Sequence, residues 1–342
     1  GSTVEAGIQQ YLANLGLAAE QRRITEAALR LVVELDYSGP TEEESLDALN
    51  QDPEFPGTDM VPVGGYGVLA NQLSSGLDIR LGVVVQGIAA AAGGVSVATN
   101  AGTFTGSHVI VTVPLAVLKA GAISFSPALP AAKQQAINNL AVGSLEKIVL
   151  RFPTVFWTGV SPDLLYISAQ RGEYPIFFDQ TQFNGQPTLI GHVGGQFARN
   201  QAAMSDASVQ IAAMQILRSL FGNGIPAPLS VHVTRWLTDP WSLGSYSFVP
   251  AGGSYPADQN GLAAPAGERV LFAGEATSPY YGTVHGAMLS GQREASRLLD
   301  ALIPVPMLPG WSSWMLPAGL LAAAWLLHRR RSKRAGFTDG GT

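Results

Sequence analysis

The stretch from Leu271 to Ala287 reads LFAGEATSPYYGTVHGA, and it largely decides how the carboxyl-terminal part of the chain folds. Its apolar start predicts a buried strand that ends at Glu275, and the pattern after Thr283 predicts a helix from Val284 to Leu302. The amino terminus of such a helix carries unpaired N–H groups and the positive end of the helix dipole. We therefore predict a strand–loop–helix unit whose turn can hold the negatively charged edge of a ligand.

Outward from this unit, the chain alternates helices with short strands. Helical spacing of apolar residues lies within 3–50 and at 131–140 and 206–221. Short β runs occur at 82–88, 95–99, 102–104, 108–113, 146–152, 164–168, 189–193, 231–236 and 270–273. The first of these runs read as a meander that feeds a buried strand. With 342 residues, 46% of them hydrophobic, and no internal repeat, we expect an α/β chain of mixed type with one large domain or two.

Composition excludes several kinds of chemistry. The absence of cysteine rules out disulfides, thiolate metal sites, a cysteine nucleophile and a thioether-linked cofactor. The five histidines show no H-x-x-x-H spacing, so we expect no metal site. Removing the five basic residues of the tail and Asp339 leaves 15 basic and 24 acidic residues, a balance of −9. An acidic body disfavours nucleic acid and mildly favours a cationic substrate.

The carboxyl-terminal tail has the pattern of a membrane anchor. Residues 311–327 read WSSWMLPAGLLAAAWLL, seventeen residues without charge, and an Arg/Lys cluster follows them. A spanning helix needs roughly 20 apolar residues, with about 17 as the lower limit. The tryptophans suit the membrane interfaces and the basic cluster would stay cytoplasmic. The alternative is an amphipathic helix docked on the body, although the run has no polar face.

The residues around this tail extend the prediction to localisation. The preceding IPVPMLPGW resembles the motif that opens bacterial sorting tails of the PEP-CTERM and IPTL kind, which implies an exported body held in the cell envelope. The chain begins GSTVEAGIQQ, which lacks the charged and apolar regions of a secretory signal peptide. Because an exported body needs an export signal, we expect the natural protein to extend further at its amino end.

Four segments, in this order, resemble one family. They read GGYGVLANQLSSGLDIRLGVVVQGI (64–88), SHVIVTVPLAVLKAGAISFSPALPAAKQQAINNLAVGSLEKIVLRF (107–152), VTRWLTDPWSLGSYSFVPAG (233–252) and LFAGEATSPYYGTVHGAMLSGQREA (271–295). Together they are similar to the flavin-containing amine oxidases, in particular to the branch of the polyamine oxidases and lysine-specific histone demethylases. Four segments at sensible spacing make a chance match improbable.

The resemblance implies a fold with two interleaved domains. Residues 56–118 and 263–303 would belong to a dinucleotide-type domain that binds FAD. Residues 3–55 and 119–262 would form a substrate domain of a mixed sheet with helices, and 304–342 would be the linker, hydrophobic helix and basic tail.

One departure from the family concerns the pyrophosphate of the cofactor. The family opens with a strand–turn–helix unit whose G-x-G-x-x-G turn lets the backbone approach the FAD pyrophosphate. The glycines from Gly64 to Gly67 lack both that spacing and a preceding strand. We therefore expect this chain to carry the flavin end of the site without the pyrophosphate cradle.

The resemblance also implies which residues bind the cofactor. Gly274, Glu275, Thr283 and Val284 would surround the flavin ring and its sugar chain, with Glu275 accepting a hydrogen bond from a ribose or ribityl hydroxyl. Val85 would lie where the family binds adenine through a strand backbone. Because the chain has no cysteine, the FAD would be held without a covalent bond.

The implied catalytic residues are Lys147, Tyr246 and Thr283. In the strand SLEKIVLRF, alternation places Lys147 on one face with Leu145 and Val149, which we predict to be the core side. The family places a lysine there, joined through a water to flavin N5. Tyr246 and Thr283 would form opposite walls of the substrate site, and Trp241 would line the flavin face.

We therefore expect FAD-dependent oxidation of an amine to an imine, with hydride transfer to flavin N5 and formation of H2O2 when O2 is the electron acceptor. Two alternatives stay open. One is a related flavoprotein, such as an amino-acid oxidase or a carotenoid or protoporphyrinogen oxidoreductase; a guanidinium at the pocket mouth, such as Arg199 or Arg235, would favour amino acids. The other is a membrane-anchored module without catalytic activity.

Overall fold

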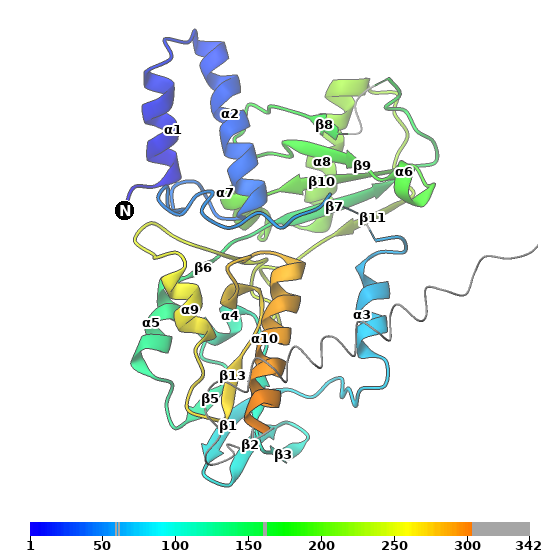
Figure 1. The fold of residues 1–342 in the computed structure, drawn as a ribbon. Coiled ribbons are helices and arrows are strands. Elements are labelled where there is room, and N and C mark those ends of the chain that lie inside the picture. Colours follow the sequence, from blue (N-terminus) through cyan, green and yellow to red (C-terminus); the bar gives the residue numbers. More distant parts are fainter. Residues whose placement is uncertain (59, 61, 160–162, 303–342) are drawn as a thin grey trace, which may run out of the picture. The chain divides into compact units, whose positions relative to one another are not determined.

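The computed structural model describes residues 1–58, 60, 62–159 and 163–302 (Figure 1). The chain divides into two compact units, Gly1–Ala295 and Ser296–Thr342, and the architecture below is that of the first. The predicted hydrophobic helix at 311–327 and the basic residues after it lie outside the described residues. Within the described ranges, no helix is both long enough and apolar enough to cross a membrane.

Helices and strands alternate along the chain as the sequence predicted. The helices are α1 (Val4–Ala13), α2 (Ala19–Asp36), α3 (Tyr66–Ser74), α4 (Leu115–Lys119), α5 (Ala131–Asn139), α6 (Thr181–Asn184), α7 (Gly195–Gln201), α8 (Asp206–Phe221), α9 (Ala257–Ala263) and α10 (Val284–Leu302), with a 3-10 turn η1 (Glu275–Thr277). The strands are β1 (Val85–Ala91), β2 (Gly94–Thr99), β3 (Gly102–Gly106), β4 (Val109–Val111), β5 (Ser124–Ser126), β6 (Ala141–Val142), β7 (Glu146–Arg151), β8 (Asp163–Leu165), β9 (Ile176–Asp179), β10 (Thr188–Val193), β11 (Ser230–Val233), β12 (Ser247–Phe248) and β13 (Val270–Phe272).

The strand of the opening stretch, β13, pairs in parallel with β4, with Leu271 opposite Ile110. A four-stranded sheet of order β3-β2-β1-β5 adjoins them through a shared apolar cluster that includes Ile88, Val111 and Phe272. The predicted meander is confirmed, because β1, β2 and β3 pair antiparallel in sequence order. β4 and β13 meet although a whole further sheet lies between them in the sequence, which is the connectivity of an interleaved fold.

That further sheet has five strands in the order β11-β7-β10-β9-β8, and every neighbouring pair is antiparallel. One face is apolar and fully buried. Alternate residues of the strands, such as Ile148, Leu150 and Leu189, pack there against Val209 and Leu217 of α8. Each buried side chain of this size stabilises the fold by roughly 1.5–3 kcal/mol, so this face anchors the sheet. The opposite face is less buried.

The first two helices form an antiparallel hairpin (Figure 1). The Thr3 hydroxyl caps α1 by accepting a hydrogen bond from the Ala6 N–H at 3.2 Å. Ile8 and Leu12 of α1 pack with Val33 of α2 in one apolar cluster. An ion pair of Arg30 with Glu5 joins the same two helices.

Candidate functional site

The turn after β13 is built as the sequence predicted, from a strand, a 3-10 turn, a loop and the start of α10. The Thr283 hydroxyl accepts a hydrogen bond from the Gly286 N–H at 3.0 Å and donates one to the Tyr280 carbonyl at 2.6 Å. Thr283 therefore caps α10 and fixes where the helix begins. Val284 begins α10, and the N–H groups at the first positions of a helix have no acceptor within the helix itself.

A cavity of about 230 Å³ lies beside this turn, where β4 and β13 end. Its lining combines residues at and after the end of β4 with the residues from Phe272 to Thr277, and adds Ser245, Leu262 and Ala287. The carboxyl ends of parallel strands are the usual place for a ligand in an α/β fold. Gly274 has φ +134°, and a Cβ there would meet nothing within 4 Å. The backbone at Gly274 is therefore open to close approach.

Glu275 fixes the loop between β13 and α10. Its carboxylate accepts hydrogen bonds from the Ser247 N–H (3.1 Å), the Ser247 hydroxyl (2.7 Å) and the Gly282 N–H (2.6 Å). Burial raises the pKa of Glu275, while these hydrogen bonds act in the opposite direction. Because a carboxylate offers about four acceptor positions, the protein itself engages most of this group. The role of Glu275 towards a ribityl or ribose hydroxyl stays a prediction.

Tyr246 lies directly against the same loop. A Cβ at Gly282 would come within 3.0 Å of Tyr246 Cδ2, so the ring packs on the glycine backbone. The Tyr246 hydroxyl donates to the Leu35 carbonyl at 2.7 Å, and burial raises the pKa of Tyr246 far above its usual range. The phenol is therefore neutral and firmly oriented.

Lys147 lies on the less buried face of the five-stranded sheet, so the prediction that it faces the core is wrong. Glu146, Ile148 and Leu150 occupy the core side of β7. Glu146 can be buried because its carboxylate accepts from the Thr234 hydroxyl at 2.5 Å and from a backbone N–H at 3.1 Å. Lys147 is nevertheless partly buried, and burial lowers the pKa of its ammonium.

The structure brings most of the predicted site residues together, but not all. Gly274, Glu275, Thr283 and Tyr246 meet around one loop. Lys147 lies two residues after Leu145, whose N–H donates to the hydroxyl of Ser245, the residue before Tyr246, at 2.7 Å. Trp241 is 63% exposed, and Val85 begins β1 in a different sheet. Neither lines the cavity beside the loop, and the roles predicted for both stay predictions.

Sequence reasoning missed three neighbours of these residues: Ser247, Gly282 and His192. Ser247 and Gly282 donate to Glu275, and His192 is the register partner of Lys147. The alternation of 189–193 could have placed His192 on one face with Ile190, but not opposite Lys147. That pairing depends on strand register, which a single sequence leaves open.

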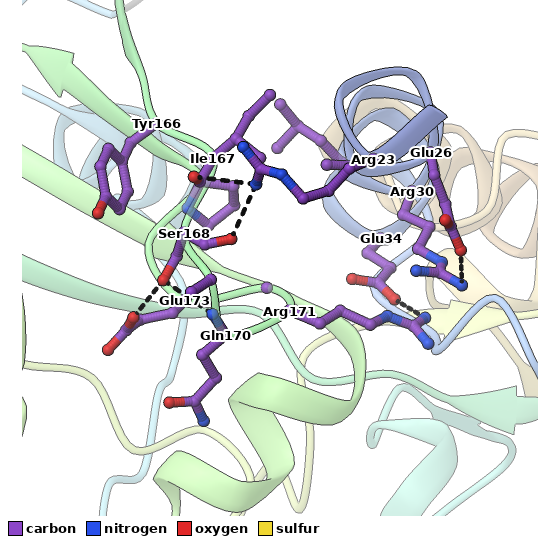
Figure 2. Close-up of a pocket in the computed structure, with 15 residues that line it drawn as sticks. Arg23, Glu26, Arg30, Glu34, Tyr166, Ile167, Ser168, Gln170, Arg171 and Glu173 are labelled. Atoms are coloured by element: carbon purple, nitrogen blue, oxygen red, sulfur yellow. Dashed lines mark hydrogen bonds and ion pairs between the residues drawn. The ribbon is translucent and has the colours of Figure 1, made fainter. Parts of the chain in front are cut away.

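A second cavity of about 230 Å³ lies between α2 and the segment 166–173 (Figure 2). Its guanidinium groups are already engaged: Arg30 pairs with Glu26 at 2.6 Å, and Arg171 with Glu34 at 2.8 Å. Figure 2 shows that the Arg30–Glu26 pair lies along α2, whereas the Arg171–Glu34 pair joins the segment to that helix.

Arg199 and Arg235, which would favour a carboxylate substrate, are engaged too. Arg199 pairs with Glu43, and Arg235 with Asp206 at 2.5 Å. Among the residues described, no group of three or more His, Asp and Glu side chains could hold a metal ion.

Comparison with known families identifies the chain. A family model described as flavin containing amine oxidoreductase matches residues 8–299. The chain belongs to this family. The resemblance seen in the four sequence segments is thereby confirmed.

Curated relatives of this amine oxidoreductase include histone demethylases. It is 37% identical over 304 residues to lysine-specific histone demethylase 1 homolog 1 of Oryza sativa subsp. japonica. The matched region covers 86% of this chain and 36% of that protein. It is 38% identical over 254 residues to human lysine-specific histone demethylase 2, covering 72% of the chain and 31% of that protein. The chain thus spans about a third of the length of these relatives.

Solved structures show the same fold. Cyclohexylamine oxidase from Brevibacterium oxydans IH-35A superposes with a TM-score of 0.71 at 23% identity, covering 88% of this chain and 68% of that one. Putrescine oxidase bound to putrescine gives a TM-score of 0.69 at 20% identity, covering 86% of this chain and 67% of that one. The mixed α/β architecture of the amine oxidoreductases is therefore confirmed.

Proposed function

We propose that this chain forms the flavin-ring and substrate side of an FAD-dependent amine oxidase, which converts an amine C–N bond to an imine. The observation that carries the proposal is that Tyr246 packs on the loop that Glu275 holds before α10, while Gly274, Glu275 and Ala287 of the same unit line a cavity. When bound, the flavin supplies the hydride acceptor and passes the electrons to O2 or another acceptor.

FAD fits this arrangement at its flavin end. The open backbone at Gly274 and the first N–H groups of α10, at Val284, would lie against the ring and sugar chain. Thr283 would hold the helix start in place. We assign the adenine end to the backbone at Val85 on the family resemblance alone. The binding would be non-covalent, since the chain has no cysteine.

The substrate side would use the groups that are already oriented. Tyr246, held by Leu35 and Gly282, would form a wall that excludes water from the approach of a neutral amine. Thr283 would form the wall of the substrate site opposite Tyr246, and Trp241 would cover the outer part of that site. Lys147, whose pKa burial lowers, would hold a water for hydrolysis of the imine. An amino-acid substrate gains no support, because Arg199 and Arg235 are both paired with carboxylates.

For the location of the protein we propose, on sequence pattern alone, that residues 311–327 anchor an exported body in the cell envelope.

Flavin binding and amine oxidation can be tested in turn. The purified chain is titrated with FAD and the bound flavin spectrum is recorded. The complex is then mixed anaerobically with a diamine, an aromatic amine and an amino acid. We expect a bound oxidised flavin that amines bleach and amino acids do not. If neither the chain nor a longer form with a G-x-G-x-x-G unit binds flavin, the proposal is wrong and a non-catalytic module is the better description.

A further inference from the structure

Lys147 and His192 are direct partners on neighbouring antiparallel strands of the five-stranded sheet. Their side chains therefore project from the same face, with Cβ atoms about 4.5–5.5 Å apart. This is the face opposite the apolar core that α8 covers. Both side chains are half-buried. A lysine and a histidine at paired positions, on an otherwise apolar stretch that includes Val149 and Ile190, need a chemical reason.

Each of the two side chains has an unused hydrogen-bonding group. Within the described residues, the Lys147 ammonium has no hydrogen bond or ion pair. The Nδ1 of His192 lies 3.3 Å from the Ile190 carbonyl oxygen. A carbonyl can only accept, so Nδ1 carries the proton in this contact and Nε2 of the neutral ring is an acceptor. Phe178 packs edge-on against the imidazole at 4.7 Å and holds its plane.

The protonation states of the pair follow from their surroundings. Burial, together with the nearby Lys147 charge, lowers the pKa of His192 to about 4. Burial lowers the pKa of Lys147 as well. From about pH 5 upwards the pair therefore carries a single positive charge, on Lys147, until the ammonium itself titrates. A donor and an acceptor then face the same space.

Other charged or titratable groups near this face do not take part. Glu146 projects to the opposite face and is bonded to Thr234. On β11, His232 is exposed and lies opposite Val149, not opposite Lys147. On β8, Asp163 is exposed and pairs with Phe178. Arg151, at the exposed end of β7, donates to Gln186 at 3.1 Å.

We propose that His192 is a positioning residue for Lys147: the two hold one water between them, with the Lys147 ammonium donating to it and His192 Nε2 accepting from it. Lys147 and His192 do not bond directly, which leaves room for that water. The arrangement keeps the ammonium oriented over the open face of the sheet. Its value to the enzyme rests on the proposed function, in which Lys147 holds the water that hydrolyses the imine.

The pair can be tested without flavin or substrate, through the pKa of Lys147 in the full chain. The sequence has four lysines, so 13C-labelled lysine side chains give few NMR signals, and Lys147→Met assigns the one of interest. In His192→Leu the ammonium loses an acceptor, and the pKa of Lys147 should fall by about one pH unit. His192→Gln retains an acceptor near the position of Nε2 and should restore most of that loss.

His232→Leu is the matched control, because it removes an imidazole from the same face without touching the pair. It should leave the pKa of Lys147 unchanged. The proposal is overturned if His192→Leu changes the pKa of Lys147 no more than His232→Leu does. It is also overturned if His192→Gln and His192→Leu give the same pKa of Lys147 while both variants unfold at the wild-type temperature. If the pKa of Lys147 depends on His192 but Lys147→Met still oxidises amines at the normal rate, His192 does position Lys147 and the catalytic role proposed for Lys147 is wrong.

Discussion

The ring of Tyr246 packs on the backbone of Gly282: a Cβ at Gly282 would lie 3.0 Å from Tyr246 Cδ2, closer than a side chain tolerates without movement. The same glycine has φ +69° and donates its N–H to Glu275 at 2.6 Å. One residue thus sets both the position of the aromatic wall and the course of the loop into α10.

Gly282→Ala should therefore destabilise the protein in two ways. The left-handed backbone costs a non-glycine residue roughly 1–2 kcal/mol, and displacement of Tyr246 adds to that. Gly267 offers a matched control, since it also has φ +69° but a Cβ there would meet nothing within 4 Å. Urea unfolding of both variants should show a larger loss for Gly282→Ala. Equal losses would mean that the contact with Tyr246 is unimportant.

The sequence predicted the elements that surround this contact, but not the contact itself. The strand 270–273 and the helix from Val284 are local patterns, and the structure confirms both. Tyr246 and Gly282 meet only because β12 reaches the loop through Ser247 and Glu275. Such contacts depend on tertiary placement, and a single sequence carries no signal for them beyond the resemblance to a family.

The incorrect prediction that Lys147 faces the core has a similar cause. Alternation divides β7 into two faces but does not tell which one packs on the core. With Lys147 assigned to the core side, alternation would leave Glu146 facing solvent, yet the Thr234 hydroxyl, just after β11, bonds its carboxylate and allows it to be buried. The partner that reverses the assignment lies far away in the sequence.

Glu44 should make the protein less stable as the pH rises. Burial raises the pKa of this carboxyl to about 9, so the folded protein keeps a proton that the unfolded chain releases near pH 4.5. Between those values the free energy of unfolding should fall by up to about 1.4 kcal/mol per pH unit. Glu44→Gln should remove this slope and stabilise the protein at pH 8. The exposed Glu43→Gln should keep the slope; if both variants keep it, Glu44 is ionised in the fold.

Lys133 should make the free energy of unfolding rise with pH above about pH 8, the opposite of the effect of Glu44. It is 2% exposed, donates to the Leu262 carbonyl and lies 3.7 Å over the Phe272 ring, and burial lowers its pKa to about 8. Above pH 8 the folded state loses this proton before the unfolded chain does, so wild type should gain roughly 2 kcal/mol relative to Lys133→Met between pH 8 and 10. Parallel stability curves of the two proteins would contradict this.

Lys147→Met should slow amine turnover by about a hundredfold while flavin binding is retained, because the methionine keeps the stem of the side chain but cannot hold a water. Arg151→Met, on the same strand and face but exposed at its end, serves as control and should leave turnover unchanged. Steady-state rates with a diamine, combined with flavin titration, separate catalysis from binding. In the Lys147→Met enzyme the loss should appear in kcat more than in KM, since the lysine acts on water and makes no contact needed for amine binding. A loss confined to KM would instead place Lys147 among the residues that bind the substrate.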